Sequence, residues 1–206
     1  MRTFSRNCDS AYAGRRLSCG LVLLIFLALL LSAGNAFPQE NPASFVFPPG
    51  SGIVANRQLE PGMNAPGFVL KDIAGAPFNF MVEKTKSPVL LVFFSMFCEP
   101  CRRSLADAQR LQDRFGNAGL RVAAVSLDGE SFRNSVSGFA RQEGYGFRVL
   151  IDEMEGYDRF RAADLFGVTE IPTVVLVDNG GRIAFVRKGA ISEVEVEKFL
   201  SAAKKP

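Results

Sequence analysis

Hydrophobic positions divide the chain into three parts. The apolar run Leu21–Leu31 lies near the N-terminus and is followed by a stretch with no sustained period of two or of 3.6 residues. Further along, short and strongly apolar runs alternate with longer segments of helical spacing. The pattern predicts a leader at 1–36, an extended linker rich in Pro, Gly, Asn and Ser at 37–60, and one folded domain at 61–206.

Within the domain, the spacing of apolar residues predicts a mixture of strands and helices. The segment 89–95 is nearly all apolar, which is typical of a strand buried on both faces. Asp178-Asn179-Gly180-Gly181 is typical of a hairpin turn, and Ser192–Glu195 fits a capping box. The expected strands are 68–70, 77–80, 89–95, 120–127, 147–151, 173–177 and 182–186, and the expected helices are 102–115, 131–143, 157–166 and 192–203. This order predicts an α/β fold in which a central mixed sheet is flanked by helices.

A Cys-x-x-Cys sequence, Cys98-Glu99-Pro100-Cys101, lies where a predicted strand gives way to a predicted helix. That position puts the first sulfur at a helix N-terminus and the second one turn inside, as reversible dithiol chemistry requires. Cys8 and Cys19, the other two cysteines, are in the leader, so the domain has no disulfide framework spread through its loops. We interpret the pair as a redox site.

Composition excludes several other functions. The leader carries four arginines and one aspartate, and the remaining chain has 20 basic and 20 acidic residues, so the charge does not indicate a nucleic-acid surface. The chain contains no histidine. Zinc would therefore have only two cysteine ligands, copper delivery would lack its usual histidine, and haem attachment would need a histidine where Arg102 stands. We expect no metal and no cofactor.

The leader predicts export. Arg15 and Arg16 precede the apolar run, and Gly34-Asn35-Ala36 is a candidate cleavage site for signal peptidase. The alternative is an uncleaved anchor at 17–36, whose basic N-terminal side would keep the leader inside and send the domain out. Both alternatives place the domain in the periplasm or an equivalent extracytoplasmic space.

Two motifs carry a resemblance to a known family. Phe97-Cys98-Glu99-Pro100-Cys101 is followed about seventy residues later by Glu170-Ile171-Pro172-Thr173 at the start of a strand, as in thioredoxin-fold oxidoreductases. The leader, the Asn64–Phe68 opening and the extra segment 131–149 make the chain similar to TlpA/ResA-type periplasmic thiol–disulfide oxidoreductases, which include cytochrome c maturation reductases. The resemblance covers about 61–203. It implies a thioredoxin-like fold with an N-terminal β-hairpin and a central αβ insertion.

The position of each cysteine predicts its role. Cys98 is the expected attacking thiol, because a helix N-terminus lowers the pKa of a thiol. Cys101 lies on the apolar face of the helix and is the expected resolving thiol. The residues expected to tune the pKa values of the pair are Glu99, Pro100, Arg102 and Ser104.

The resemblance also implies a substrate site. Pro172 would follow a cis peptide and, lacking an N–H, would leave the Ile171 backbone to pair with an extended substrate segment beside Cys98. Phe97 and Ile171 would form its apolar rim, whereas Phe94 is expected in the core.

The sequence departs from the family pattern at three positions. Phe97 stands where the family usually has tryptophan, so the aromatic ring is kept and its N–H donor is lost. Ser104 replaces a glutamate of the ResA-type reductases, and Val92 replaces the buried aspartate of thioredoxin. The carboxylates that relatives place near the cysteine pair are therefore absent by residue type.

The resulting hypothesis is an exported enzyme that exchanges electrons with protein cysteines through mixed disulfides. By resemblance it would be a reductant supplied by a membrane thiol-electron carrier, with apocytochrome c as a candidate substrate. One alternative is a peroxiredoxin-like peroxidase, whose P-x-x-x-[ST]-x-x-C pattern is matched at Ser95 and lost at Leu91. The other is a non-enzymatic thioredoxin-fold binding module in which Cys98 and Cys101 form a structural disulfide.

Overall fold

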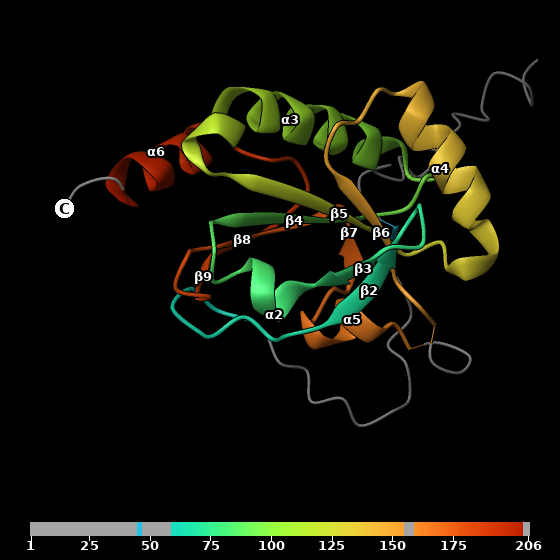
Figure 1. The fold of residues 1–206 in the computed structure, drawn as a ribbon, viewed down its shortest axis with the longest axis horizontal. Coiled ribbons are helices and arrows are strands. Elements are labelled where there is room, and N and C mark those ends of the chain that lie inside the picture. Colours follow the sequence, from blue (N-terminus) through green and yellow to red (C-terminus); the bar gives the residue numbers. More distant parts are fainter. Residues whose placement is uncertain (1–44, 47–58, 155–158, 204–206) are drawn as a thin grey trace, which may run out of the picture. The chain divides into compact units, whose positions relative to one another are not determined.

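Strand β4 (Val89–Phe94) lies inside the sheet of the computed structural model, which describes residues 45–46, 59–154 and 159–203. All six of its side chains are buried. Its backbone pairs with a strand on each side, and its two faces are covered by helices, so polar side chains are disfavoured at every position (Figure 1). This accounts for the apolar run in the sequence.

The main sheet has seven strands in the order β3-β2-β6-β5-β4-β8-β9. The three strands β4, β5 and β6 are parallel to one another, and the outer strands on both sides pair antiparallel. The other strands are β2 (Val69–Asp72), β3 (Pro77–Asn79), β5 (Arg121–Ser126), β6 (Arg148–Ile151), β8 (Thr173–Val177) and β9 (Ile183–Lys188). The predicted mixed sheet and both predicted hairpins are confirmed.

Helices cover both faces of this sheet. In Figure 1, α3 (Glu99–Phe115), α4 (Arg133–Gln142) and α6 (Glu193–Ala203) lie on one side, and the short helices α2 (Phe80–Glu83) and α5 (Arg161–Leu165) lie on the other. Two ion pairs join α3 to α6, Arg110–Glu193 at 3.1 Å and Arg114–Glu197 at 2.9 Å. Single 3₁₀ turns, η1 (Gly116–Ala118) and η2 (Glu130–Phe132), follow α3 and precede α4.

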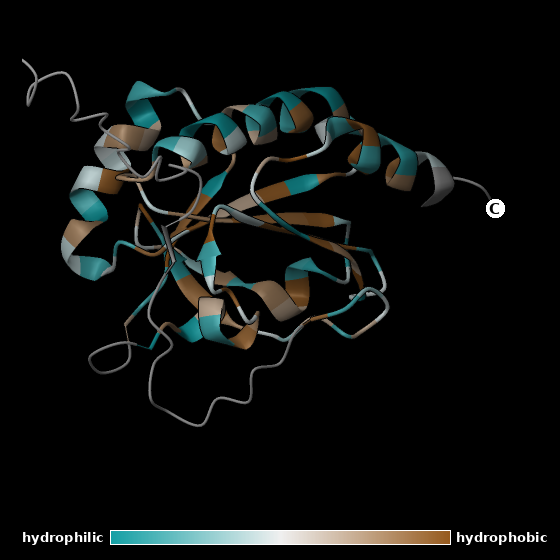
Figure 2. Ribbon diagram, turned by 180° about the vertical axis from the view of Figure 1, so that it is seen from behind, coloured by the Kyte–Doolittle hydropathy of each residue, from teal (hydrophilic) through white to brown (hydrophobic). Residues whose placement is uncertain are grey.

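Apolar residues concentrate on the strands and on the helix faces turned toward them (Figure 2). On the side of α2 and α5, the core is built from phenylalanines. Phe68 stacks on Phe80 with ring centroids 4.8 Å apart, and Phe166 meets both edge-on at 5.9 Å. In a chain without tryptophan, these offset and edge-on rings supply large buried area, and each pair adds about 0.5–1.5 kcal/mol beyond it.

Helices α3 and α5 differ most from the sequence prediction, since each begins more than two residues from its predicted start, whereas α4 and α6 begin within two residues of theirs. Helix α3 begins at Glu99 rather than Arg102, because Cys98 is its N-cap and Pro100 fits the first turn, where its missing N–H is not needed. Helix α5 is shorter than the predicted 157–166, of which residues 157 and 158 lie outside the described residues. Helix α2 and the two-residue strands were not predicted, since they are too short to show a period.

The segment predicted to be a linker contributes a short strand. β1 (Phe45–Val46) pairs antiparallel with β7 (Glu170–Ile171) in a separate two-stranded sheet. The leader at 1–36, with the predicted signal peptide or anchor, lies outside the described residues. In the part of the chain that is described, no helix is both long and apolar enough to cross a membrane.

Asp152 is a buried carboxyl that follows β6 and caps α5. Its two oxygens accept hydrogen bonds from the backbone N–H groups of Ala162 and Ala163 at 2.8–3.1 Å. Its side chain is fully shielded from solvent. Burial raises the pKa of Asp152 from its ordinary 3.8 to about 6, although the backbone N–H donors act in the opposite direction.

This raised pKa predicts a pH dependence of stability. The contribution of Asp152 is fully present below about pH 4, where the carboxyl is protonated in both states, and is lost as pH rises through about 6. The difference between the two pKa values corresponds to about 3 kcal/mol. Asp152→Asn should therefore remove a fall in the unfolding free energy between pH 4 and 7, measured by urea denaturation. Identical pH slopes for the two proteins would contradict this prediction.

Candidate active site

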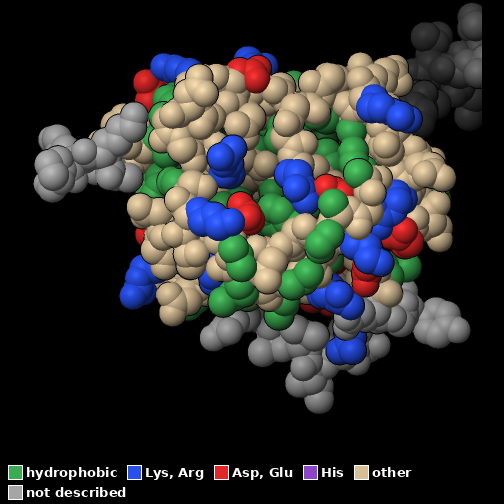
Figure 3. Space-filling view, viewed as in Figure 1, with side chains coloured by type: hydrophobic (Ala, Val, Ile, Leu, Met, Phe, Trp, Pro, Cys, Tyr) green, Lys and Arg blue, Asp and Glu red, His purple; other side chains and the backbone are tan. Residues whose placement is uncertain are grey.

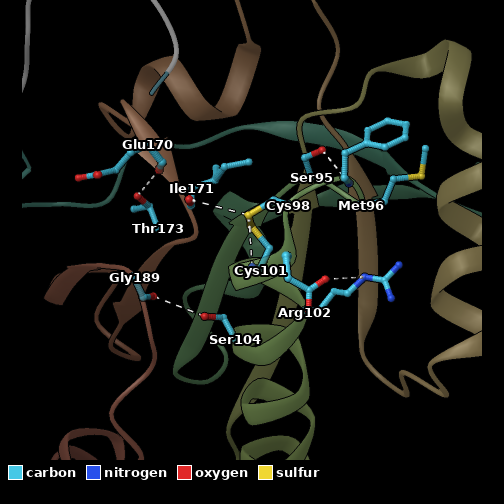
Figure 4. Close-up of a disulfide and its surroundings, with 12 residues drawn as sticks. Ser95, Met96, Cys98, Cys101, Arg102, Ser104, Glu170, Ile171, Thr173 and Gly189 are labelled. Carbon is cyan, nitrogen blue, oxygen red and sulfur yellow. Dashed lines mark hydrogen bonds and ion pairs between the residues drawn. A yellow bond between two sulfur atoms is a disulfide. The ribbon is translucent and has the colours of Figure 1, made fainter. Parts of the chain in front are cut away.

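Cys98 and Cys101 form a disulfide at the start of α3 (Figure 4). Cys98 is the N-cap residue, with extended backbone angles, and its Sγ accepts the N–H of Cys101 at 3.2 Å. The side chain of Cys98 is 9% exposed and that of Cys101 is completely buried. An incoming sulfur can therefore reach the pair only at Cys98.

The backbone of β7 lies against the other side of Cys98. The carbonyl oxygen of Ile171 is 3.9 Å from the Cys98 sulfur, and the Ile171–Pro172 peptide is cis, as the resemblance implied. Figure 4 shows the sulfur between the first turn of α3 and this carbonyl. The Ile171 side chain is buried, so it is the backbone of Ile171 that is presented to the sulfur.

A set of short hydrogen bonds fixes the segment that carries Pro172. The Thr173 hydroxyl donates to the Glu170 carbonyl at 2.6 Å, and the Gly189 N–H donates to the Pro172 carbonyl at 2.7 Å. The Ser104 hydroxyl in turn donates to the Gly189 carbonyl at 3.5 Å. Through Gly189, Ser104 thus connects α3 to the segment that carries Pro172. Its position in the fold supports this structural role.

Arg102, the charged residue directly after the pair, is engaged by neighbouring side chains. Arg102 stacks on the Phe139 ring at 5.2 Å and forms ion pairs with Glu143 at 3.6 Å and Glu99 at 3.9 Å. Figure 4 shows its side chain extending away from the disulfide. In this disulfide form the Arg102 guanidinium is engaged by Phe139, Glu143 and Glu99, and its tuning of the Cys98 pKa stays a prediction.

Val92 and Ser104, the two positions at which the sequence lacks a carboxylate, are both buried. Val92 is fully buried in β4, where it pairs with Ala124 and Val174 on the neighbouring strands. Ser104 is also buried. Among the described residues, no group of three His, Cys, Asp or Glu side chains is arranged to hold a metal ion.

Sequence reasoning missed two residues of the site. Asp128 follows β5 and accepts hydrogen bonds from the segment before Cys98. Phe132 in η2 meets Phe97 edge-on at 5.7 Å, and both rings are exposed, Phe97 at 73%. Because carboxyl ends of adjacent parallel strands meet at one edge of a sheet, the Asp128-Gly129 pair after β5 was a signal that could have located this part of the site.

Comparison with known proteins extends these observations. Residues 61–186 match the AhpC/TSA family. The thiol-disulfide oxidoreductase ResA of Bacillus subtilis (strain 168) is 29% identical over 152 residues, which are 74% of this chain and 80% of that protein. ResA of Halalkalibacterium halodurans is 28% identical over 155 residues, covering 75% of this chain and 84% of that protein.

Solved structures show the same fold. A Chlorobium tepidum protein assigned as a thiol:disulfide interchange protein DsbE has a TM-score of 0.59 at 28% identity, covering 71% of this chain and 98% of that chain. A thiol-disulfide isomerase from Corynebacterium glutamicum has a TM-score of 0.58 at 19% identity, covering 68% and 96%. The second likeness concerns the fold alone.

The placement of Arg102 leads to a prediction for the thiol. We expect Arg102→Ala to change the pKa of Cys98 by less than about 0.3, because this half-exposed cation is engaged by Glu143 and Phe139 and is screened by solvent. The pH dependence of iodoacetamide alkylation of the reduced protein measures the pKa. Arg103→Ala, on the same helical turn, is the matched control. A rise of about one pKa unit for Arg102→Ala alone would show that its side chain acts on Cys98.

Proposed function

The chain belongs to the AhpC/TSA family and is a thioredoxin-fold oxidoreductase, and we propose that it exchanges disulfides with the cysteines of exported proteins. The predicted resemblance to the ResA-type oxidoreductases is confirmed by these relatives. One observation carries the proposal: a Cys98 sulfur at a helix N-terminus that is largely buried but still reachable, bonded to a fully buried Cys101 and faced by the backbone of β7.

Exchange would proceed in two steps. In the reduced protein, the Cys98 thiolate attacks one sulfur of a substrate disulfide, forming a mixed disulfide and releasing the other substrate sulfur as a thiolate. The Cys101 thiolate then attacks the Cys98 sulfur, which forms the Cys98–Cys101 disulfide, breaks the mixed disulfide and releases the second substrate sulfur as a thiolate. The substrate gains two electrons and the enzyme pair loses two.

The local backbone supports Cys98 as the attacking thiol. A thiolate at this N-cap accepts the N–H of Cys101 and faces the positive end of the α3 dipole, and both interactions favour the charged form. Only about a tenth of the Cys98 side chain is exposed, which is enough for attack at the sulfur and limits solvation of the thiolate. The Cys101 sulfur is not accessible to a substrate and can react only with the Cys98 sulfur beside it.

Deprotonation of Cys101 has no carboxylate helper at Ser104 or Val92. The first step of the reaction releases a substrate thiolate next to the pair, and a thiolate is a base. We propose that this thiolate, or water, accepts the proton of Cys101. The hydroxyl of Ser104 is already directed to the Gly189 carbonyl.

The direction of electron flow is part of the proposal. The relatives named ResA and the predicted leader support an extracytoplasmic reductant that receives electrons from a membrane thiol carrier, with apocytochrome c as a candidate substrate. A measured reduction potential as high as roughly −120 mV, typical of a strong oxidant, would reverse the direction. Peroxide reduction is less well supported, since the Ser95 hydroxyl that fits the peroxidase pattern donates to Asp128.

Removing the resolving thiol tests the exchange mechanism. Cys101→Ala should accumulate covalent complexes with exported proteins through Cys98, because the mixed disulfide can no longer be resolved from within the site. Non-reducing electrophoresis of cell extracts, with mass spectrometry of the cross-linked peptides, detects these complexes. Cys98→Ala is the control and should trap nothing. Failure of Cys101→Ala to trap any protein thiol would exclude the proposal.

The pairing of β1 with β7 affects substrate access. If a substrate strand pairs with the Ile171 backbone, it must take the place that β1 holds. Val46→Pro removes one backbone donor from β1, and loss of one hydrogen bond worth about 0.5–1.5 kcal/mol should raise the rate with a protein disulfide about 2- to 10-fold.

A small disulfide provides the comparison in this experiment. The rate with 5,5′-dithiobis(2-nitrobenzoate), which has no strand to pair, should not change in Val46→Pro. Ala55→Pro, in the same predicted linker and outside β1, is the control substitution. Equal protein-disulfide rates for both variants and the parent chain would show that substrates do not use the edge held by β1.

A further inference from the structure

One carboxylate joins the end of β5 to the segment that leads into Cys98. Asp128 accepts the Ser95 hydroxyl at 2.6 Å with Oδ1, and accepts the Met96 N–H at 3.0 Å and the Ser126 hydroxyl at 2.6 Å with Oδ2. Three hydrogen bonds therefore converge on a half-buried carboxylate, and two of them come from residues immediately before Cys98. Hydrogen bonds to a charged acceptor are roughly twice as strong as neutral ones.

Two further bonds carry this constraint to the cysteine. The Ser95 hydroxyl that donates to Asp128 also accepts the Phe97 N–H at 3.2 Å. The Ser95 carbonyl accepts the Cys98 N–H at 3.1 Å. The backbone of each residue from Met96 to Cys98 is thus bonded either to Asp128 or to a residue that Asp128 holds.

This part of the chain needs such support because regular structure does not provide it. The strand ladder between β4 and β5 ends with the Leu127 N–H on the Phe94 carbonyl at 2.8 Å, and α3 begins at Glu99. The four residues between them belong to neither element. Their backbone sets where Cys98 lies relative to the N–H groups of α3, and hence how well its thiolate is stabilised.

We propose that Asp128 is a positioning residue for disulfide exchange: through Ser95 and Met96 it fixes the turn that presents Cys98, and with it the exposed Phe97 ring beside Phe132. The inference deepens the proposed function and rests on it for its catalytic consequence. Asp128 touches neither sulfur in this set of bonds, so it acts through the turn and not as an acid or base.

Variants that keep the charge test position separately from electrostatics. Ser95→Ala removes the bridging hydroxyl, and Asp128→Glu displaces the carboxylate by one methylene, while both leave a negative charge at the site. In a Cys101→Ala background, each should raise the pKa of Cys98 by about one unit and lower its alkylation rate at pH 7 by up to about tenfold, since only the thiolate reacts.

Asp128→Asn distinguishes positioning of the turn from a purely electrostatic effect of the carboxylate on Cys98. If the carboxylate acted only as a nearby charge, Asp128→Asn would lower the pKa of Cys98 and Ser95→Ala would leave it unchanged. If it positions the turn, Ser95→Ala and Asp128→Glu move the pKa upward together. Unchanged pKa values and alkylation rates in those two variants would overturn the proposal, and so would a lowered pKa in Asp128→Asn alone.

Two controls separate positioning from general loss of stability. Asp178→Asn alters another turn carboxylate, which accepts the N–H groups of Gly180 and Arg182 at 2.8 Å, at the end of the sheet opposite Cys98. It should lower stability without moving the pKa of Cys98. Ser126→Ala removes two bonds to Asp128, the one that the Ser126 hydroxyl donates to Oδ2 and the one that it accepts from the Asp128 N–H at 3.2 Å. It leaves the bonds from Asp128 to Ser95 and Met96 in place, so its effect should be smaller than that of Ser95→Ala.

The same experiment remains informative if the proposed function fails. Alkylation reports on the Cys98 thiol whether or not the protein exchanges disulfides with other proteins. A protein that traps no partner and still shows the raised pKa values would refute the proposed function and leave the positioning role intact. For a protein that does exchange, Ser95→Ala should lower kcat/KM with protein disulfides by the same factor as alkylation.

Discussion

The chemistry of this protein depends on where β4 ends. The strand is buried on both faces and is held by β5 and β8, so the residue that leaves it has a fixed position and direction. Four residues later, Cys98 meets the N-terminus of α3 on one side and the Ile171 carbonyl on the other. Both neighbours are tied to the same framework: α3 packs on the sheet, and the Pro172 segment is bonded to Gly189 after β9. A shift of β4 would change every distance at the sulfur.

In the proposed exchange, recognition of a partner at this site would rely more on backbone and apolar contact than on charge. Basic and acidic side chains are interspersed over the face seen in Figure 3, with hydrophobic side chains between them. Arg102, the cation nearest the motif in sequence, is engaged by Glu143 and Phe139. Beside Cys98 lie the exposed rings of Phe97 and Phe132 and the edge of β7. Such a surface suits extended segments of varied sequence, because backbone pairing carries little sequence preference.

The sequence was sufficient for the main strands, the long helices and the cysteine pair, since each has a strong local signal. The apolar run of β4 and the one-sided stripe of α3 extend over enough residues to show their periods. The contact between Cys98 and Ile171 came from resemblance, because no local pattern brings together residues separated by 73 positions. The orientation of Arg102 and the bonds of Asp128 depend on tertiary neighbours. A polar residue that follows a strand can cap a helix, form a turn or face solvent, so the sequence around Asp128 does not identify its partner. The register of β5 against β4 places Asp128 beside Ser95.

Ser104 and Val92 carry no carboxylate, and Asp128 is the acid bonded to the turn before Cys98, so the proposed mechanism assigns proton transfer and positioning to different groups. A proton acceptor must reach a sulfur, whereas a positioning acid must be saturated with donors so that it holds them in place. Asp128 accepts three hydrogen bonds, as a positioning acid must, and the Ser104 hydroxyl donates to a backbone carbonyl rather than to a sulfur. In the proposed mechanism, proton transfer in the resolving step is assigned to the thiols themselves and to water. The rate of exchange should accordingly follow the acidity of the substrate's leaving thiol, which ties the choice of substrate to its chemistry as well as to its shape.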